Sequence, residues 1–413
     1  MPETIDSNVS NQMTYNFNDK IKDFSIKGVR VLGNPVAGVI IGIDSDSGND
    51  LDQIIKGKAT AEQINKQSML LNELHENGYF SPIQYSLVSA YVHLTSACNL
   101  HCVGCYSYED ERNKRESLST AQVFQILENL KQSGVQKLVF SGGEPFLRKD
   151  ISEILRYAKG RLRFSSIIVV SNGTLPVEAY IKCAPYIDML NISIDGYAKD
   201  VIYLRDSGIM PIIEKNIETL KGIVNLNMIV TLHRKNINDI PKYLDLSNRL
   251  QVPFTVSLFT VPADNPVFKD FILTDEDYTK LEEMYECFSD VVLTDSALEG
   301  DLGCKEACGA GKTMVSISAN GTIYPCHMLQ MDEFRIGNAL TDSVSEAVLN
   351  GNLYNLTVSD ISDCNVCEYR FLCGGGCRFR SYAHNNGDMS RKDKCCGTYK
   401  GTFSKMFTQL LNQ

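Results

Sequence analysis

Cysteine spacing is the feature that most constrains this chain. Cys98, Cys102 and Cys105 stand close together, directly after an apolar run that covers residues 87–94. Three thiolates at these spacings can each bind one iron of a four-iron cluster, and no fourth cysteine follows nearby. One iron of such a cluster would stay open to a ligand that is not a protein side chain.

In this CxxxCxxC pattern the chain resembles the radical SAM superfamily, whose motif follows the first strand of a barrel. The resemblance implies that S-adenosylmethionine chelates the open iron, and that reduction of the cluster yields a 5'-deoxyadenosyl radical. One position departs from the family pattern. The residue before the third cysteine is usually aromatic, and here it is Gly104, so Tyr106 is a candidate for the contact to adenine.

Composition describes an ordinary globular protein and excludes some functions. The chain has 413 residues, of which 43% are hydrophobic and 22% charged, which is enough for two or three domains. Since no apolar run is long enough to span a membrane and residues 1–14 are polar, we expect no membrane partner and a cytoplasmic location. Fourteen cysteines then favour metal-binding thiolates over disulfides. A net charge of −10 argues against binding to nucleic acid.

Strands and helices alternate between about Ser86 and Asp290, a pattern typical of an α/β fold with a parallel sheet. The strands are expected at 87–95, 137–141, 166–171, 189–195, 226–232 and 254–259, and the helices start near 119, 149, 177, 200, 238 and 275. The family resemblance makes these units a partial (β/α)6 TIM-type barrel. Chemistry in such barrels lies at the carboxyl ends of the strands.

Two groups of polar residues follow these strands. Gly142, Gly143 and Glu144 match the GGEP motif of the family; glycines let the backbone approach a ligand, and the carboxylate can hold the ammonium of the cofactor. A simple turn is the alternative interpretation.

The second group begins with Asn172, after the third strand. Asn191, Ser193 and Asp195 alternate along the fourth strand and so share one face. By resemblance, Ser193 contacts the ribose or carboxylate of the cofactor with Asp195 beside it, and Arg205 clamps the carboxylate. The alternatives are a turn at Asp195 and a solvated surface charge at Arg205.

The first 85 residues predict a small domain of another kind. Residues 24–33 and 36–43 read as a hairpin that turns at Asn34, and helices are expected near 50–55 and 61–76. The pattern is winged-helix-like and resembles the PqqD-like peptide-recognition domain of many peptide-modifying radical SAM enzymes. Such a domain binds a leader peptide by strand addition. A structural cap without a ligand is the alternative.

The C-terminal region, 301–413, is rich in cysteine. The segments Cys308-x12-Gly321-x4-Cys326 and Cys364-x2-Cys367-x5-Cys373-x3-Cys377-x17-Cys395 are similar to the SPASM domain, which extends many radical SAM enzymes. Apolar residues are sparse between 360 and 400, so bound metal would have to supply folding energy.

The SPASM resemblance implies two auxiliary clusters. It assigns the inner one to Cys304, Cys308, Cys326 and Cys377. It assigns the outer one to Cys364, Cys367, Cys373 and Cys395, where Cys396 could replace Cys395. Zinc bound by four thiolates is the alternative here, as it is at Cys102 and Cys105 with His93 or His101.

Together the parts predict three domains, 1–85, 86–300 and 301–413, with three [4Fe-4S] clusters and S-adenosylmethionine as cofactors. We interpret the chain as a radical SAM maturase that cross-links a ribosomally made precursor peptide, with a cysteine thioether preferred over carbon–carbon or carbon–oxygen bonds. The expected partners are the precursor peptide and an electron donor such as flavodoxin or ferredoxin. A sulfatase-maturase-like enzyme is disfavoured, because His327 stands where those relatives have an aspartate that acts as the base. A non-catalytic zinc-stabilised scaffold is the remaining alternative.

Overall fold

The computed structural model describes residues 15–107, 113, 117–261, 266–287, 292–293, 302–351 and 353–411. The chain divides into two compact units. One comprises Met1–Gln84 together with Asp301–Lys305, and the other comprises Tyr85–Gly300 together with Glu306–Gln413. The barrel and the cysteine-rich region therefore belong to one unit.

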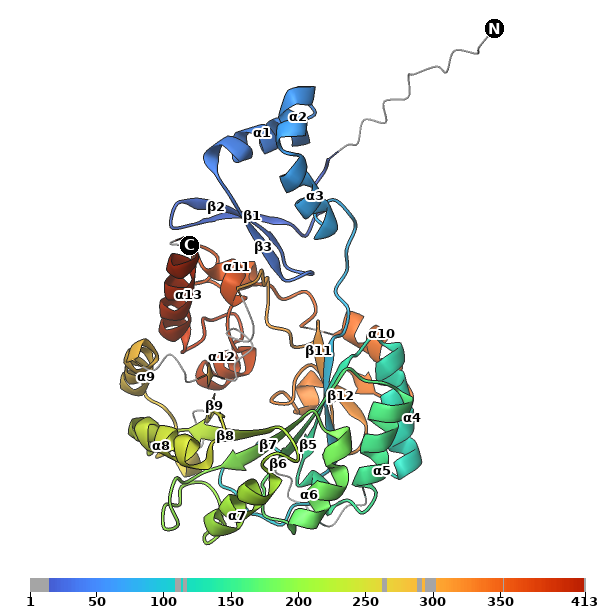
Figure 1. Cartoon of the computed structure of the whole chain (residues 1–413), viewed down its shortest axis with the longest axis vertical. Helices are drawn as coiled ribbons and strands as arrows, with labels where there is room; N and C mark the ends of the chain where they lie inside the picture. The colour runs from blue at the N-terminus through green and yellow to red at the C-terminus, as the bar shows by residue number, and fades with distance from the viewer. Residues whose placement is uncertain are drawn as a thin grey trace. The chain divides into compact units, whose positions relative to one another are not determined.

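The first unit contains an antiparallel sheet of three strands, β1 (Lys22–Ile26), β2 (Val29–Asn34) and β3 (Val39–Ile43) (Figure 1). Lys27 and Gly28 both have positive φ angles, 48° and 80°, and make a tight turn between β1 and β2. The single strand expected over 24–33 is therefore wrong, because the Lys-Gly pair reverses the chain in its middle.

Three helices pack on this sheet: α1 (Ser45–Ile55), α2 (Ala61–Lys66) and α3 (Ser68–Glu76). The expected single helix over 61–76 is broken at Gln67, whose buried amide donates to the Asp50 carboxylate at 3.0 Å. Gln63 and Lys66 donate to the same carboxylate. Because Asp50 lies on α1, these bonds hold the end of α2 against that helix.

The second unit is built on six parallel strands, close to the ranges expected from the sequence. They are β4 (Ser89–Thr95), β5 (Lys137–Gly142), β6 (Ser166–Ser171), β7 (Met189–Ile194), β8 (Leu226–Leu232) and β9 (Phe254–Leu258). A short strand, β10 (Val292–Leu293), pairs with β9. Every second residue of these strands is fully buried beneath the helices, so the apolar alternation of the sequence sets the register.

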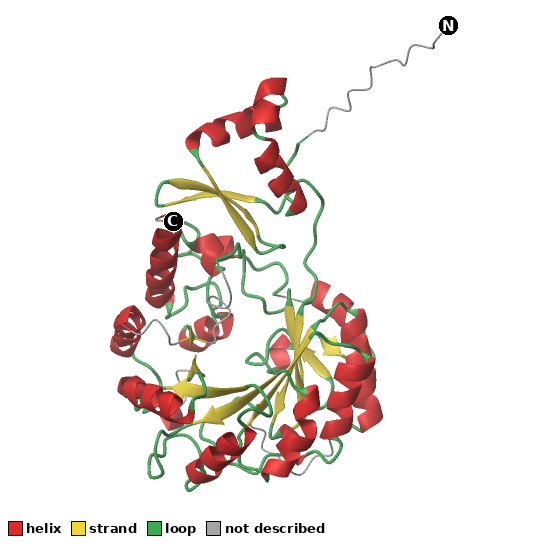
Figure 2. Cartoon of the chain, viewed as in Figure 1, coloured by secondary structure: helices red, strands yellow, loops and turns green. Residues whose placement is uncertain are grey.

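Helices connect the strands and cover the outer face of the sheet (Figure 2). They are α4 (Thr120–Gln132), α5 (Ile151–Arg156), α6 (Val177–Cys183), α7 (Met210–Leu220), α8 (Ile240–Leu250) and α9 (Asp275–Cys287). The α/β class and the barrel are thus confirmed. The helix expected near 200 starts at Met210 instead, because Asp195 holds residues 203–205 in a loop.

The sheet continues into the cysteine-rich region. Strand β11 (Met314–Ile317) pairs in parallel with β4, and the antiparallel strands β12 (Thr322–Tyr324) and β13 (Gly337–Asn338) follow it. Helices α10 (Val344–Leu349), α11 (Arg370–Cys373), α12 (Arg378–His384) and α13 (Cys396–Leu411) complete the region. In the described part of the chain, no helix is long and apolar enough to cross a membrane.

Candidate active site

The loop that carries Cys98, Cys102 and Cys105 follows β4 and is anchored by its backbone. The N–H of Val103 donates to the carbonyl of Leu204 at 2.7 Å, and the N–H of His101 donates to the Asp206 carboxylate at 3.1 Å. The loop therefore depends on residues 204–206, which follow β7.

The three thiols lie close enough to influence one another. Burial raises the pKa of the Cys102 thiol, and the charges of Cys105 and Cys98 raise it further, whereas Arg205 lowers it. A guanidinium nitrogen of Arg205 lies 3.9 Å from the Cys102 sulfur. Arg205 is therefore at the cysteine site and not a solvated surface charge. Thiolates beside a fixed cation suit an anionic iron–sulfur cluster.

Gly104 has no side chain, and the ring of Phe259 lies against the cysteine loop at this position. Its φ is +65°, and a Cβ atom there would stand 2.4 Å from two ring carbons of Phe259, which follows β9. The ring therefore occupies the space next to residue 104. The Tyr106 hydroxyl bonds the Ser141 hydroxyl at 2.7 Å, and the contact of Tyr106 to adenine stays a prediction.

The glycines of the GGE segment approach backbone of the chain itself. A Cβ on Gly143 would lie 2.0 Å from the carbonyl oxygen of Ala97, and one on Gly142 would lie 2.4 Å from that of Thr95. The N–H of Gly143 donates to the Thr95 carbonyl and the N–H of Glu144 donates to the Ala97 carbonyl, each at 2.7 Å. The segment is thus bonded to the residues that lead directly into Cys98.

Glu144 is fully buried and its oxygens already accept hydrogen bonds. They accept from the Ser171 hydroxyl at 2.9 Å, the Asn172 N–H at 2.8 Å and the Phe146 N–H at 3.1 Å. Burial raises the pKa of Glu144 to about 7, although these donors oppose the rise. In the structure the carboxylate joins the ends of β5 and β6. Its contact to the cofactor ammonium stays a prediction.

The remaining predicted residues have different surroundings. Asn172 donates to the Asn99 side chain in the cysteine loop at 2.8 Å. Asp195 accepts the backbone N–H groups of Tyr203, Leu204 and Arg205 at 2.7, 2.9 and 3.2 Å, so it shapes the loop that presents Arg205. Ser193 is half-buried on the inner face of β7.

Around Tyr106, the same interior is lined by aromatic and polar side chains that were not predicted as cofactor contacts. Tyr91 stacks on His327 with ring centroids 4.1 Å apart, and Tyr106 meets the edges of His327 and His93 at 5.5 and 5.7 Å. The Gln330 amide lies 3.3 Å from His93 and donates to the Ser316 hydroxyl. The signal for Tyr91 and His93 was their alternation along the first strand, the same pattern that singled out Asn191 and Ser193.

The two histidines of this interior are held neutral. Burial lowers the pKa of His93 to about 3 and that of His327 to about 4. Neutral imidazole rings can accept a hydrogen bond and carry no charge near pH 7. His327 therefore borders the barrel interior and is not an exposed surface residue.

The C-terminal cysteines fall into separate groups. Cys308, Cys326 and Cys377 pack around one small apolar cluster that includes Leu329 and Phe379. Cys304 is buried in the first unit, where a Cβ on Gly33 would lie 2.5 Å from its sulfur. Its assignment to the inner cluster stays a prediction.

Among the outer cysteines, burial raises the pKa of Cys364 to about 11, and the charges of Cys396 and Cys367 raise it further. No three His, Cys, Asp or Glu side chains within the described ranges converge on a point that one metal ion could occupy.

Comparison with known proteins agrees with this arrangement. Residues 92–247 match the radical SAM superfamily, and residues 308–370 match the SPASM iron–sulfur cluster-binding domain. The chain therefore carries a radical SAM domain followed by a SPASM domain, whose cofactors are [4Fe-4S] clusters and S-adenosylmethionine.

Among relatives, the mycofactocin maturase MftC of Mycolicibacterium smegmatis is 28% identical over 69% of this chain and 76% of its own length. An AdoMet-dependent heme synthase of Methanosarcina barkeri is 25% identical over 73% of this chain and 94% of its own. The crystal structure of Streptococcus suis SuiB bound to precursor peptide SuiA superposes with a TM-score of 0.58 at 16% identity, and the match covers 92% of this chain and 99% of SuiB. The last likeness concerns the fold alone.

Proposed function

We propose that this protein is a radical SAM maturase that installs a cross-link in a ribosomally made precursor peptide, with a cysteine thioether as the first bond to test. The similarity to MftC, which is named a mycofactocin maturase, supports this proposal. The observation that carries the proposal is the single sheet that joins the two cofactor-binding regions through β4 and β11. That sheet brings Tyr106, next to Cys105, against His327, next to Cys326.

Several residues would hold the cofactors. Cys98, Cys102 and Cys105 would bind the cluster that has an open iron, and Arg205 would face the carboxylate of S-adenosylmethionine. Since the Glu144 carboxylate is engaged, backbone oxygens of the GGE segment are an additional candidate for its ammonium. The Phe259 ring would supply the apolar contact that Gly104 cannot. When bound, these groups supply a radical able to take a hydrogen atom from an unactivated carbon and clusters able to accept the remaining electron.

The protein's own part is to orient the peptide and exclude water. The inner wall offers aromatic faces at Tyr91 and Tyr106 and neutral hydrogen-bonding groups at His93, His327 and Gln330. Such a wall can pack against a peptide side chain without placing a competing charge beside it. Rigid strands hold these groups, so the reacting carbon can be held in one position.

We assign leader binding to the first unit. Its three-stranded sheet has two edge strands, β1 and β3, and an extended peptide can pair with an edge strand through main-chain hydrogen bonds. We also propose that this unit is PqqD-like and that the protein is cytoplasmic. A flavodoxin or ferredoxin would donate its electrons.

The test uses full-length protein, purified anaerobically and reconstituted with iron and sulfide. Reduction in the presence of S-adenosylmethionine should release 5'-deoxyadenosine. Addition of a cysteine-bearing precursor encoded beside the gene should give a product lighter by two hydrogens that alkylating reagents no longer label at that cysteine. The variant with Cys98, Cys102 and Cys105 all changed to alanine should lose about four of about twelve irons and all activity. A product that still reacts with the alkylating reagent would exclude the thioether.

The heme synthase relative favours one second candidate, a small-molecule substrate modified by the same radical chemistry. Removal of residues 1–84, which leaves Cys304 in place, separates the two candidates. A peptide maturase should lose its affinity for the precursor and keep the uncoupled release of 5'-deoxyadenosine. Turnover of a porphyrin with no precursor present would support the second candidate and contradict the first.

A further inference from the structure

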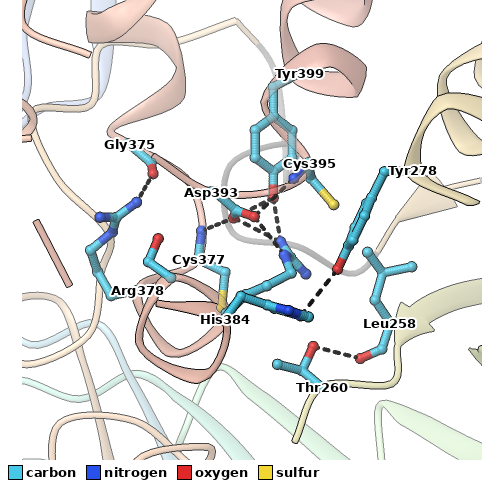
Figure 3. Close-up of polar contacts among 12 residues, drawn as sticks. Leu258, Thr260, Tyr278, Gly375, Cys377, Arg378, His384, Asp393, Cys395 and Tyr399 are labelled. Atoms are coloured by element: carbon cyan, nitrogen blue, oxygen red, sulfur yellow. Dashed lines mark hydrogen bonds and ion pairs between the residues drawn. The ribbon is translucent and has the colours of Figure 1, made fainter. Parts of the chain in front are cut away.

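A buried ion pair lies among the cysteines of the SPASM domain. The Arg380 Nε donates to Asp393 Oδ1 at 2.6 Å, and a second guanidinium nitrogen donates to Asp393 Oδ2 at 2.9 Å and to the Tyr399 hydroxyl at 2.7 Å (Figure 3). The residues Arg380 and Asp393 are 3% and 2% exposed. Burying two charges is costly unless further hydrogen bonds satisfy them, so this pair needs a reason.

The reason lies in what else Asp393 binds. Its Oδ2 accepts the backbone N–H of Cys377 at 2.5 Å, and its Oδ1 accepts the N–H of Cys395 at 3.0 Å. Cys377 is assigned to the inner cluster, and the Cys395–Cys396 pair supplies the last ligand of the outer one. One carboxylate thus ties together the backbones of two separate cluster sites.

A glycine permits this approach. Gly376 has a φ of +74°, and a Cβ at this position would lie 2.6 Å from Asp393 Oδ2 and 2.8 Å from a ring carbon of Tyr399. Any larger residue before Cys377 would push the carboxylate away. The close approach of the Asp393 carboxylate to the Cys377 backbone therefore requires a glycine at position 376.

We propose that Asp393 and Arg380 are positioning residues that couple the two auxiliary-cluster sites. The proposal rests on the iron–sulfur assignment of this domain and not on the peptide substrate. Its failure can therefore be told apart from failure of the maturase function. Since the carboxylate borders both sites, its charge acts on the reduction potentials of both clusters.

The test uses full-length protein in which Cys98, Cys102 and Cys105 are alanine, so that only auxiliary clusters are counted. After reconstitution this background should hold about eight irons.

The coupling is tested in the same background by redox titrations monitored by electron paramagnetic resonance. Asp393→Asn removes a negative charge from both sites and should raise both potentials, whereas Arg380→Gln should lower both. Asp388→Asn is the matched control, since this carboxylate binds Ser390 and Arg391 instead of a cysteine backbone, and it should leave both potentials unchanged.

A shift confined to one cluster, or no shift in either, would refute the coupling. If Asp393→Asn or Arg380→Gln does not fold, Tyr399→Phe takes its place, because it retains the ion pair and removes only the hydroxyl that accepts from Arg380 and donates to Asp393. Small shifts of both potentials in Tyr399→Phe would support the coupling, and unshifted potentials would count against it.

Discussion

The two cysteine sites of the second unit are held by different means. The loop with Cys98, Cys102 and Cys105 sits at the end of parallel strands whose residues beneath the helices, such as Leu138, Ile167 and Met228, are fully buried. The SPASM cysteines surround small apolar clusters and short helices. A large apolar core can preform a site before any cofactor binds, whereas a region with a small core must take its rigidity from elsewhere.

Buried polar groups sharpen this contrast. Within the described residues, four buried side-chain atoms have no hydrogen-bond partner, and three of them lie in the SPASM region, on Arg378, Ser381 and Thr398. The remaining one is His233 Nε2 in the barrel. Such groups are costly in a folded protein. The SPASM region therefore relies on ion pairs such as Arg380–Asp393, and on bound metal, more than the barrel does.

The largest effect that we expect comes from removing iron. In chelator-treated full-length protein, amide hydrogen exchange over 360–411 should accelerate by about 100-fold or more, while β4 to β9 keep their protection, because only the first region depends on metal for its fold. Equal loss of protection in both regions would break the comparison.

A smaller but local effect is expected for Gly143→Ala. The new methyl group would stand 2.0 Å from the Ala97 carbonyl, so either the cysteine loop or the GGE segment must move. We expect a cost of about 3 kcal/mol in unfolding free energy and loss of S-adenosylmethionine binding, measured by chemical denaturation and equilibrium dialysis. Gly160→Ala, where a Cβ meets nothing within 4 Å, is the control and should leave binding of S-adenosylmethionine unchanged.

Arg205→Lys should act on the cofactor with little effect on the fold. Lysine keeps the charge and loses the planar fork, so it cannot hold a carboxylate by two parallel bonds. Affinity for S-adenosylmethionine should fall by about 10-fold to 100-fold, which corresponds to about 1.4–2.8 kcal/mol. Unchanged affinity would mean that Arg205 serves the Cys102 thiolate alone.

The smallest effect concerns pH. The pKa of His93 is about 3 in the folded state against 6.5 in the unfolded chain, so the unfolded state binds its proton first as pH falls. This histidine therefore costs stability progressively from about pH 6.5 down to about pH 3. His93→Gln should make the acid loss of stability shallower than in the wild type, as measured by urea unfolding at several pH values. If the unfolding free energies of the variant and the wild type fall in parallel with pH, His93 titrates normally.

Much of the barrel could be predicted because its signals are local. Apolar alternation set the strands, and the spacing of Cys98, Cys102 and Cys105 indicated their role. The errors arose where one side chain acted at a distance. Asp195 drew residues 203–205 into a loop and delayed α7, and Gln67 turned inward to Asp50 and divided a helix. Neither contact produces a periodic pattern of residues in the sequence.

The sequence by itself determined the chemistry that this chain can support. Thiolate spacing, the GGE segment and the C-terminal cysteine pattern define the cofactors, because ligand identity is a property of residue type and short-range spacing. Only the tertiary structure decided which groups meet. It brought Phe259 to Gly104, engaged Glu144 in hydrogen bonds, set His327 beside Tyr91 and Tyr106, and joined Cys377 to Cys395 through Asp393. These contacts join residues far apart in the chain, and packing of the whole sheet fixes them.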